Sequence, residues 1–239
     1  MKLLLCILLA PLPSIIWLAF YLRKDKHPEP NKMVIKIFLF GAVMIAFAAL
    51  LEQGFYIGLR ELSLSEKIAL LVIGFAFIEE LLKYLVVKFG VLKSPDFDEP
   101  IDSMLYMIIA ALGFAAAENI YLLTQMSPLK IEFGGTIEFI TTRFLGATFL
   151  HALASAIMGY FLAASLCVKS KIRRIFKGFG LIIATVLHSI FNYIIILNID
   201  GQIDAVQRNI IIFVLLLGTG IIVSLMFKKI NKLRAVCKL

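Results

Sequence analysis

Long apolar stretches of the sequence contain ionisable side chains, which are rare there, and three glutamates and two histidines among them could do chemistry together. They are Glu79, Glu80, Glu118, His151 and His188. A charged side chain at the centre of a membrane span costs roughly 2.5–3.5 kcal/mol on insertion scales. Such residues face a bundle interior or a water-filled cavity, and they are functional candidates. Two imidazoles and a carboxylate form the ligand set of a catalytic zinc, which keeps its fourth position open.

These residue types predict a hydrolytic zinc site. Glu118, His151 and His188 can supply the three ligands, and Glu79 or Glu80 can act as the general base. The HExxH helix motif is absent, so the ligands must come from separate segments of the chain. Adjacent residues of a helix point about 100° apart, and the sequence leaves open which of the two glutamates is the base.

A purely structural interpretation competes with this chemistry. Lys83 follows Glu79 by four residues and Glu80 by three, so it can form an ion pair with one of them. One lysine cannot neutralise both carboxylates, and the second one still needs a reason. Glu118 alone could be a protonated hydrogen-bond donor between helices, with small residues such as Gly113 allowing a close approach.

Seven apolar blocks must position these residues, and each is long enough to cross about 30 Å of hydrocarbon. The blocks are Leu3–Leu22, Val34–Leu59, Ile68–Val91, Ile101–Gln125, Phe139–Val168, Phe179–Ile199 and Ile210–Phe227. Of the 239 residues, 61% are hydrophobic and 17% are charged, and the mean hydropathy is +0.96. A soluble domain has about 45–50% apolar and about 25% charged residues. The sequence therefore predicts an all-α, polytopic membrane bundle in which residues 1–239 form one transmembrane domain.

The basic residues predict the orientation of this bundle. Three alternate connectors and the C-terminal tail carry 15 Lys and Arg, and the opposite side carries 5. This bias predicts an N-terminus outside and a C-terminus in the cytoplasm, with the first span retained rather than cleaved. Because the positive residues cluster beside apolar blocks, we expect contact with the lipid bilayer and not with nucleic acid.

The predicted spans bring the ionisable residues to similar depths. Counted from the outer ends of their spans, Glu79, His151 and His188 are about 11–12 residues deep, and Glu118 is about 7 residues deep. At about 1.5 Å per residue, these positions lie roughly 10–18 Å below the outer surface. Four spans can therefore contribute to one site.

Four ordered sequence blocks resemble a known family. They are EExxK at Glu79, Glu80 and Lys83; FxxxEN at Phe114, Glu118 and Asn119; RFLGATFLHALASAIMGY with Arg143, His151 and Gly159; and HxxxN at His188 and Asn192. Together they are similar to the PrsW-type intramembrane proteases, relatives of the CAAX prenyl endopeptidases and abortive-infection proteins. The resemblance covers a core of about residues 73–193. Ser103 departs from the glycine that is usual in the second block.

The resemblance implies a peptidase in the bacterial plasma membrane. Its substrate would be a single-pass membrane protein such as an anti-sigma factor, cut at the extracytoplasmic side to begin a stress response. Lys83, Asn119 and Arg143 would support the site. The family leaves the mechanism open: without a metal, Glu79 would activate water, while His188 and Asn192 would stabilise the oxyanion. The second imidazole, His151, favours the zinc mechanism.

A transporter or proton-coupled channel is the main alternative from another class, because Glu and His residues at bilayer depth also form proton relays. Transporters often place broken helices or inverted repeats around the site. The seven prolines instead lie in the first span, in connectors or at span ends. A membrane scaffold is less favoured because five buried ionisable groups are costly.

Overall fold

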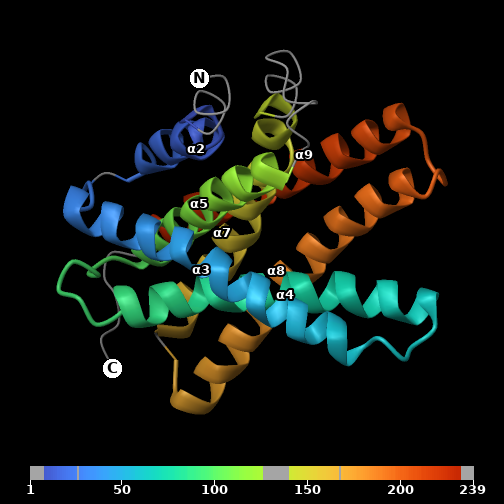
Figure 1. Cartoon of the computed structure of the whole chain (residues 1–239). Coiled ribbons are helices and arrows are strands. Elements are labelled where there is room, and N and C mark those ends of the chain that lie inside the picture. The colour runs from blue at the N-terminus through green and yellow to red at the C-terminus, as the bar shows by residue number, and fades with distance from the viewer. Residues whose placement is uncertain (1–7, 26, 126–139, 167, 233–239) are drawn as a thin grey trace.

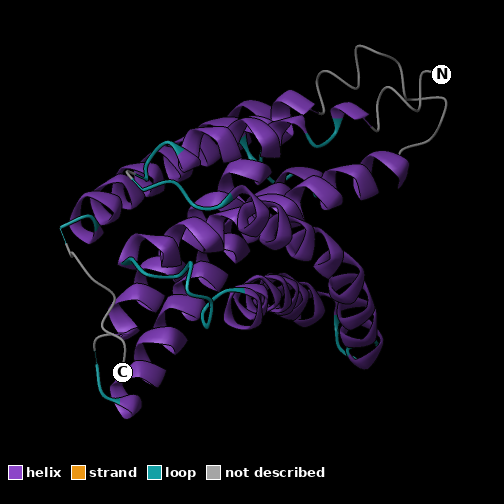
Figure 2. Cartoon of the chain, turned by 90° about the vertical axis from the view of Figure 1, so that its left-hand side faces the viewer, coloured by secondary structure: helices purple, strands orange, loops and turns teal. Residues whose placement is uncertain are grey.

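The computed structural model describes residues 8–25, 27–125, 140–166 and 168–232, and these ranges contain helices and no strand (Figure 2). The helices are α2 (Leu12–Leu22), α3 (Asn31–Gly58), α4 (Leu64–Gly90), α5 (Pro100–Gln125), α7 (Ala147–Leu166), α8 (Ser170–Ile199) and α9 (Ala205–Ile230). Each predicted apolar block corresponds to one of them, and α3 and α4 run back along each other (Figure 1). Residues 3–7 of the first block and Phe139 and Cys167 of the fifth lie outside the described residues.

Five helical stretches of the described chain are long and apolar enough to cross a membrane: α3, α5, residues 140–166, α8 and α9. The helix α2 is too short by itself, with 11 residues. The helix α4 is long enough to cross a membrane, but its charged residues make it too polar to belong to these five stretches. The protein is therefore a multi-pass membrane protein, and the number of seven spans and the orientation of the termini stay predictions.

Several helices extend beyond the apolar blocks that predicted them. The helix α8 begins at Ser170, nine residues before the expected Phe179, and its added turns carry basic residues such as Lys171 and Arg174. Lysine and arginine are good helix formers, and their long side chains can reach the membrane surface. A turn at Gly146 separates the helical residues 140–145 from α7, so the expected fifth span is interrupted near its start.

The helix α5 lies at the centre of the bundle and packs most extensively against α7 and α3. Glycines allow these backbones to approach closely. A Cβ at Gly41 of α3 would lie 2.0 Å from the carbonyl oxygen of Ala110, and one at Gly113 of α5 would lie 1.9 Å from that of Phe38. A Cβ at Gly159 of α7 would lie 2.6 Å from the α5 backbone. The expected close approach at Gly113 is thus confirmed.

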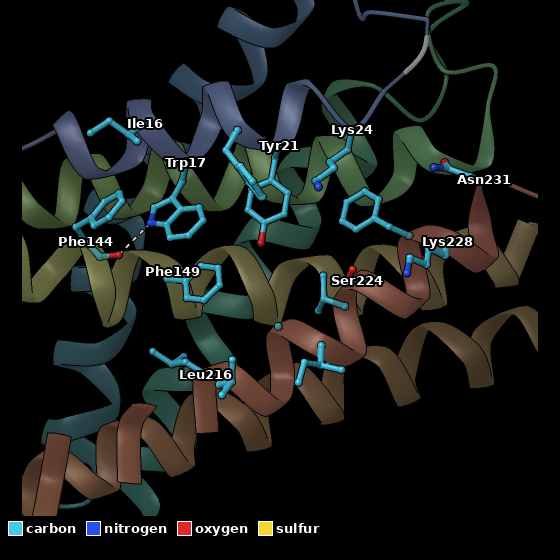
Figure 3. Close-up of a pocket in the computed structure, with 16 residues that line it drawn as sticks. Ile16, Trp17, Tyr21, Lys24, Phe144, Phe149, Leu216, Ser224, Lys228 and Asn231 are labelled. Atoms are coloured by element: carbon cyan, nitrogen blue, oxygen red, sulfur yellow. Dashed lines mark hydrogen bonds between the residues drawn. The ribbon is translucent and has the colours of Figure 1, made fainter. Parts of the chain in front are cut away.

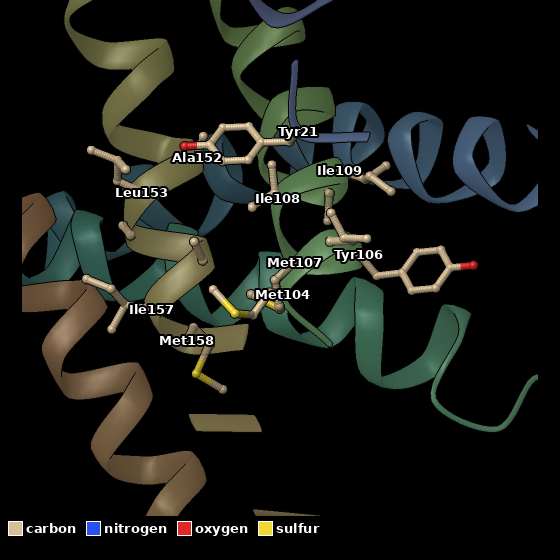
Figure 4. Packing of buried hydrophobic residues seen from close by; sticks show 14 of the residues in the cluster. Tyr21, Met104, Tyr106, Met107, Ile108, Ile109, Ala152, Leu153, Ile157 and Met158 are labelled. Atoms are coloured by element: carbon tan, nitrogen blue, oxygen red, sulfur yellow. The ribbon is translucent and has the colours of Figure 1, made fainter. Parts of the chain in front are cut away.

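A methionine-rich apolar core fills the contact between α5 and α7 (Figure 4). Met104 and Met107 of α5 face Ile157 and Met158 of α7, and all four are almost fully buried. Methionine adapts its shape to irregular gaps between helices. This core fixes the position of α7 relative to α5, which matters because both helices carry ionisable residues closer to the other end.

One end of the bundle gathers three chain segments, which we call the basic end: the connector 23–30, the connector 91–99, and the end of α9. Tyr106 of α5 donates a hydrogen bond to Glu29, and His27 Nδ1 lies 2.7 Å from Glu99 Oε1. Lys24 and Lys228 line one cavity. These segments follow the first, third and seventh predicted spans, so a chain that crosses the membrane at each span places them at the same end.

Candidate active site

The helix α4 presents three ionisable residues to the interior of the bundle. Glu80 and Lys83 are completely buried, whereas the Glu79 side chain keeps 12% of its surface exposed. Spacings of three and four residues place Lys83 next to both carboxylates: its Nζ lies 2.8 Å from Glu80 Oε1 and 3.3 Å from Glu79 Oε2. One lysine thus contacts two glutamates, of which only Glu79 is accessible.

Glu80 ties α4 to two other helices. Its Oε1 accepts a hydrogen bond from His188 Nδ1 of α8 at 3.0 Å, and its Oε2 accepts one from Ser155 Oγ of α7 at 3.4 Å. Because a carboxylate can only accept, Nδ1 of His188 carries the hydrogen. The Nε2 of a neutral His188 is then left with its lone pair, 4.0 Å from Glu79 Oε2. Glu80 therefore orients the imidazole.

His151 of α7 is oriented in the same way by another carboxylate. Its Nε2 lies 2.9 Å from Glu118 Oε2 of α5, and its Nδ1 lies 2.7 Å from Lys83 Nζ. The ammonium group can only donate and the carboxylate can only accept, so the hydrogen of a neutral His151 is on Nε2. Nδ1 presents its lone pair toward Lys83 and toward Glu79, whose Oε2 is 3.8 Å away.

A polar network outside the imidazoles holds Glu118. Arg143 donates to Glu118 and also to Asn119 Oδ1. The Asn119 amide nitrogen donates to Thr148 Oγ1 and to the Ala10 carbonyl oxygen, each at 3.3 Å. The network therefore connects α5 with α7 and with the chain before α2.

Three donors of different helices form a group that could hold a metal ion. One ligand atom each from Glu79, His151 and His188 lies within 4.8 Å of the other two. The two imidazole rings are 4.9 Å apart and perpendicular. Zinc bonds to nitrogen and oxygen of about 2.0–2.2 Å place ligand atoms about 3.3–3.6 Å apart in a tetrahedron. The observed separations from Glu79, 3.8 and 4.0 Å, are close to this value, so the donor set fits the ion.

The charges of the site do not cancel. Glu79, Glu80 and Glu118 face two cations, Lys83 and Arg143, and neutral imidazoles leave a formal charge of −1. Outside water, an unbalanced charge is costly and favours the binding of another cation or a proton. The site is thus prepared for a cation or for proton transfer.

The structure brings nearly all the predicted site residues together from α4, α5, α7 and α8, with Arg143 from the segment before α7. Glu118 is not in the metal-competent group, because it lies on the far side of His151. Asn192 is half-buried one turn after His188, and it makes no hydrogen bond with another described residue. Its predicted oxyanion role is left without a contact, and the metal role of Glu118 stays a prediction.

The sequence motifs did not include Glu52 of α3. Glu52 is half-buried and lies close enough to Glu79 and Glu118 for their charges to act on it. An acidic residue inside the second apolar block was the available signal. No spacing connects it with the other motifs, so the motif pattern does not single it out.

The sequence is similar to those of a known protein family. Residues 29–222 match the family described as PrsW family intramembrane metalloprotease. The protein named Protease PrsW from Geobacillus kaustophilus is 33% identical over 179 residues, which cover 74% of this chain and 73% of the relative. Those from Oceanobacillus iheyensis and Bacillus subtilis are 29% and 28% identical, each over 77% of this chain and 79% of the relative.

No solved structure matches the chain. The family match nevertheless covers most of the sequence, including every helix that contributes to the ionisable cluster. Four motifs predicted the family, and relatives match the chain over about three quarters of its length. The chain therefore belongs to the PrsW family of intramembrane proteases.

Proposed function

We propose that this protein hydrolyses a peptide bond of a single-pass membrane protein, within the depth of the bilayer. One observation carries the proposal. The partly exposed carboxylate of Glu79 faces His188 Nε2 and His151 Nδ1, the second of which also accepts from Lys83. Each imidazole is fixed by another carboxylate behind it. Carboxylates behind metal-ligating histidines are a common feature of catalytic metal sites, since they fix the tautomer and the orientation of the ring.

Zinc is the cofactor that fits these donors, with His151, His188 and Glu79 as its ligands. The ion would polarise the scissile carbonyl and acidify a water molecule. Glu80 and Glu118 hold the two imidazoles in the required tautomers. Glu118 orients His151 from the far side of the ring, where its Oε2 is already held by Arg143. The second oxygen of Glu79 would move the proton from water to the leaving amine nitrogen.

A second mechanism, without metal, is favoured by Lys83. Its ammonium group contacts Glu80 and also Glu79 and Nδ1 of His151, which are two of the three donors that a metal ion would use. In this mechanism Glu79 takes the proton from water and passes it to the leaving amine. Asn192 would then have to turn toward the substrate to stabilise the oxyanion.

The family and the depth of the site support a membrane protein as the substrate. Glu79 lies near the middle of α4 and His188 lies past the middle of α8, so a cleaved bond must be reachable inside the membrane or at its face. An anti-sigma factor cut on the extracytoplasmic side, at the start of a stress response, is the substrate that we propose.

Cleavage by the purified protein in proteoliposomes tests the hydrolase. The substrates are single-pass membrane proteins, including candidate anti-sigma factors of the host. Glu79→Gln is expected to lower the cleavage rate by about 10²–10⁴-fold, because it removes the carboxylate that both mechanisms need. The matched control is Glu61→Gln, an exposed change outside the site. Equal cleavage by both variants would rule the proposal out.

Zinc content separates the two mechanisms. The zinc mechanism predicts about one bound zinc ion per chain in the wild type. The ion should be lost in His188→Ala and retained in Glu118→Gln. A chelator should then stop cleavage, and added zinc should restore it. Zinc-free protein that cleaves normally in the presence of a chelator selects the metal-free mechanism, in which Glu79 is the base.

A further inference from the structure

A cavity of about 680 Å³ lies between α2, α7 and α9, away from the ionisable cluster (Figure 3). Its wall is apolar along most of its length, formed by Trp17, Phe144, Phe149 and Leu216 among others. The indole of Trp17 stacks on the rings of Phe149 and Phe144, with centroids 4.2 and 5.2 Å apart. Its Nε1 donates to the Phe144 carbonyl oxygen at 2.9 Å, so the one polar atom of the indole is satisfied within the wall.

A glycine makes room along the α9 side of this cavity. Gly220 lines it, and a Cβ built there would meet only the Phe149 ring, 3.7 Å away. This is an ordinary contact distance, so a Cβ at this position would not collide with the backbone. A larger side chain there would therefore occupy part of the cavity.

One end of the cavity is positively charged. Lys24, Lys228 and Asn231 line it at the basic end, where α2 and α9 both terminate. Neither lysine forms an ion pair with a carboxylate of the described residues, and the Lys24 ammonium lies 4.7 Å from the Phe20 ring. Two cations and an amide thus stand at the mouth of an apolar channel, at the level where a membrane span ends.

We propose that this cavity binds one anionic phospholipid. Its acyl chain lies along Trp17, Phe149 and Gly220, and its phosphate lies between Lys24 and Lys228. Clusters of lysine next to the membrane attract anionic headgroups, by about fivefold in affinity per lysine and about 25-fold for the pair. The proposal does not depend on the hydrolytic chemistry.

The size of the cavity favours a lipid chain over a substrate helix. A transmembrane helix about 10 Å across and about 30 Å long occupies roughly 2,400 Å³. The cavity offers less than a third of that volume. A helix would also meet two unpaired lysines at its end, which suits an anionic headgroup better than a peptide backbone.

Trp17 is the only tryptophan of the chain, so its fluorescence reports on the cavity directly. The full-length protein is reconstituted in phosphatidylcholine vesicles that contain increasing fractions of phosphatidylglycerol with brominated acyl chains. The bromine atoms quench the fluorescence of a tryptophan that contacts these chains. The comparison uses brominated phosphatidylcholine at the same fractions. We expect phosphatidylglycerol to reach half-maximal quenching at a much lower mole fraction, with a preference that falls as salt increases.

Matched variants locate the binding. Lys24→Gln/Lys228→Gln should abolish the preference for phosphatidylglycerol, whereas Lys229→Gln should keep it, because Lys229 contacts Tyr160 and does not line the cavity. Gly220→Leu should weaken quenching by both lipids. Gly218→Leu, with open space around it, should not.

Three results would overturn the proposal. These are equal quenching of the wild type by both lipids, a preference that survives in the double lysine variant, and quenching that a transmembrane substrate peptide removes in competition. The last result would assign the cavity to a substrate helix.

Discussion

The protein contains two clusters of carboxylates that are equally compact but differ in what surrounds them. Glu79 groups with two imidazoles beside Lys83, and Asp25, Glu29 and Asp102 group near the basic end; in each group the donor atoms lie within 4.8 Å of one another. The second set is called the acidic cluster below. The neighbouring residues determine how the negative charge of each cluster is balanced.

The acidic cluster balances its charge with protons and hydrogen bonds. Neither Glu29 nor Asp102 forms an ion pair with a described lysine or arginine. Burial first, and then the neighbouring charges of Asp102 and Asp25, raise the pKa of Glu29 to about 8, although the Tyr106 hydroxyl opposes this. Compactness alone therefore does not distinguish the candidate active site, whose cluster also contains cations and imidazoles.

The largest effect is expected from Lys83→Met in the active-site cluster. This change leaves Glu80 completely buried without its closest cation, which typically costs about 3–5 kcal/mol of folding free energy. The measurement is unfolding by SDS titration in mixed micelles. Lys229→Met, at an exposed position, is the control. A loss below about 1 kcal/mol would mean that His188 and Ser155 alone can satisfy Glu80.

A double substitution sharpens the same comparison. Lys83→Met together with Glu80→Gln removes both charges, so the loss should be smaller than the sum of the two single losses by about 1–3 kcal/mol. Strict additivity would show that the two residues contribute independently, contrary to their 2.8 Å contact.

The smallest effect is expected from Glu29→Gln in the acidic cluster. The folded-state pKa of Glu29, about 8, is above its ordinary value of 4.5, so the folded protein binds more protons between these pH values. Its stability should fall as pH rises from about 4.5 to about 8 and then level off. Glu29→Gln should remove this pH dependence. The stability that is lost over this range in the wild type should be less than about 1 kcal/mol, because Glu29 is half-buried. SDS titrations at pH 5, 7 and 9 measure it, and an unchanged slope would contradict the assignment.

The helices and the central ionisable residues of the candidate site could be predicted from the sequence because both depend on local pattern. Apolar blocks interrupted by polar connectors predicted every long helix, and the cost of charge in hydrocarbon singled out Glu79, Glu80, Glu118 and the two histidines. The distribution of roles could not be predicted. Whether Glu79 or Glu80 is accessible depends on the rotation of α4 against its neighbours, which tertiary packing decides.

Other features depend on contacts between distant segments. Glu118 lies behind His151 because Arg143, 25 residues later in the chain, holds it there. Glu52 joins the surroundings of the site because of the packing of α3 against α4 and α5. The helix α2 carries no motif, yet the Ala10 carbonyl just before it accepts a hydrogen bond from Asn119. None of these relations has a signature in local spacing.

The glycines of the bundle also provide a guide for engineering. Gly41, Gly113 and Gly159 stand against backbone atoms of a neighbouring helix and tolerate no side chain. Gly54 of α3 and Gly178 of α8 have nothing within 4 Å of an added Cβ. Alanine is favoured over glycine in a helix by about 1 kcal/mol. Gly54→Ala and Gly178→Ala are therefore the first substitutions to try for a heat-resistant variant that withstands purification and crystallisation.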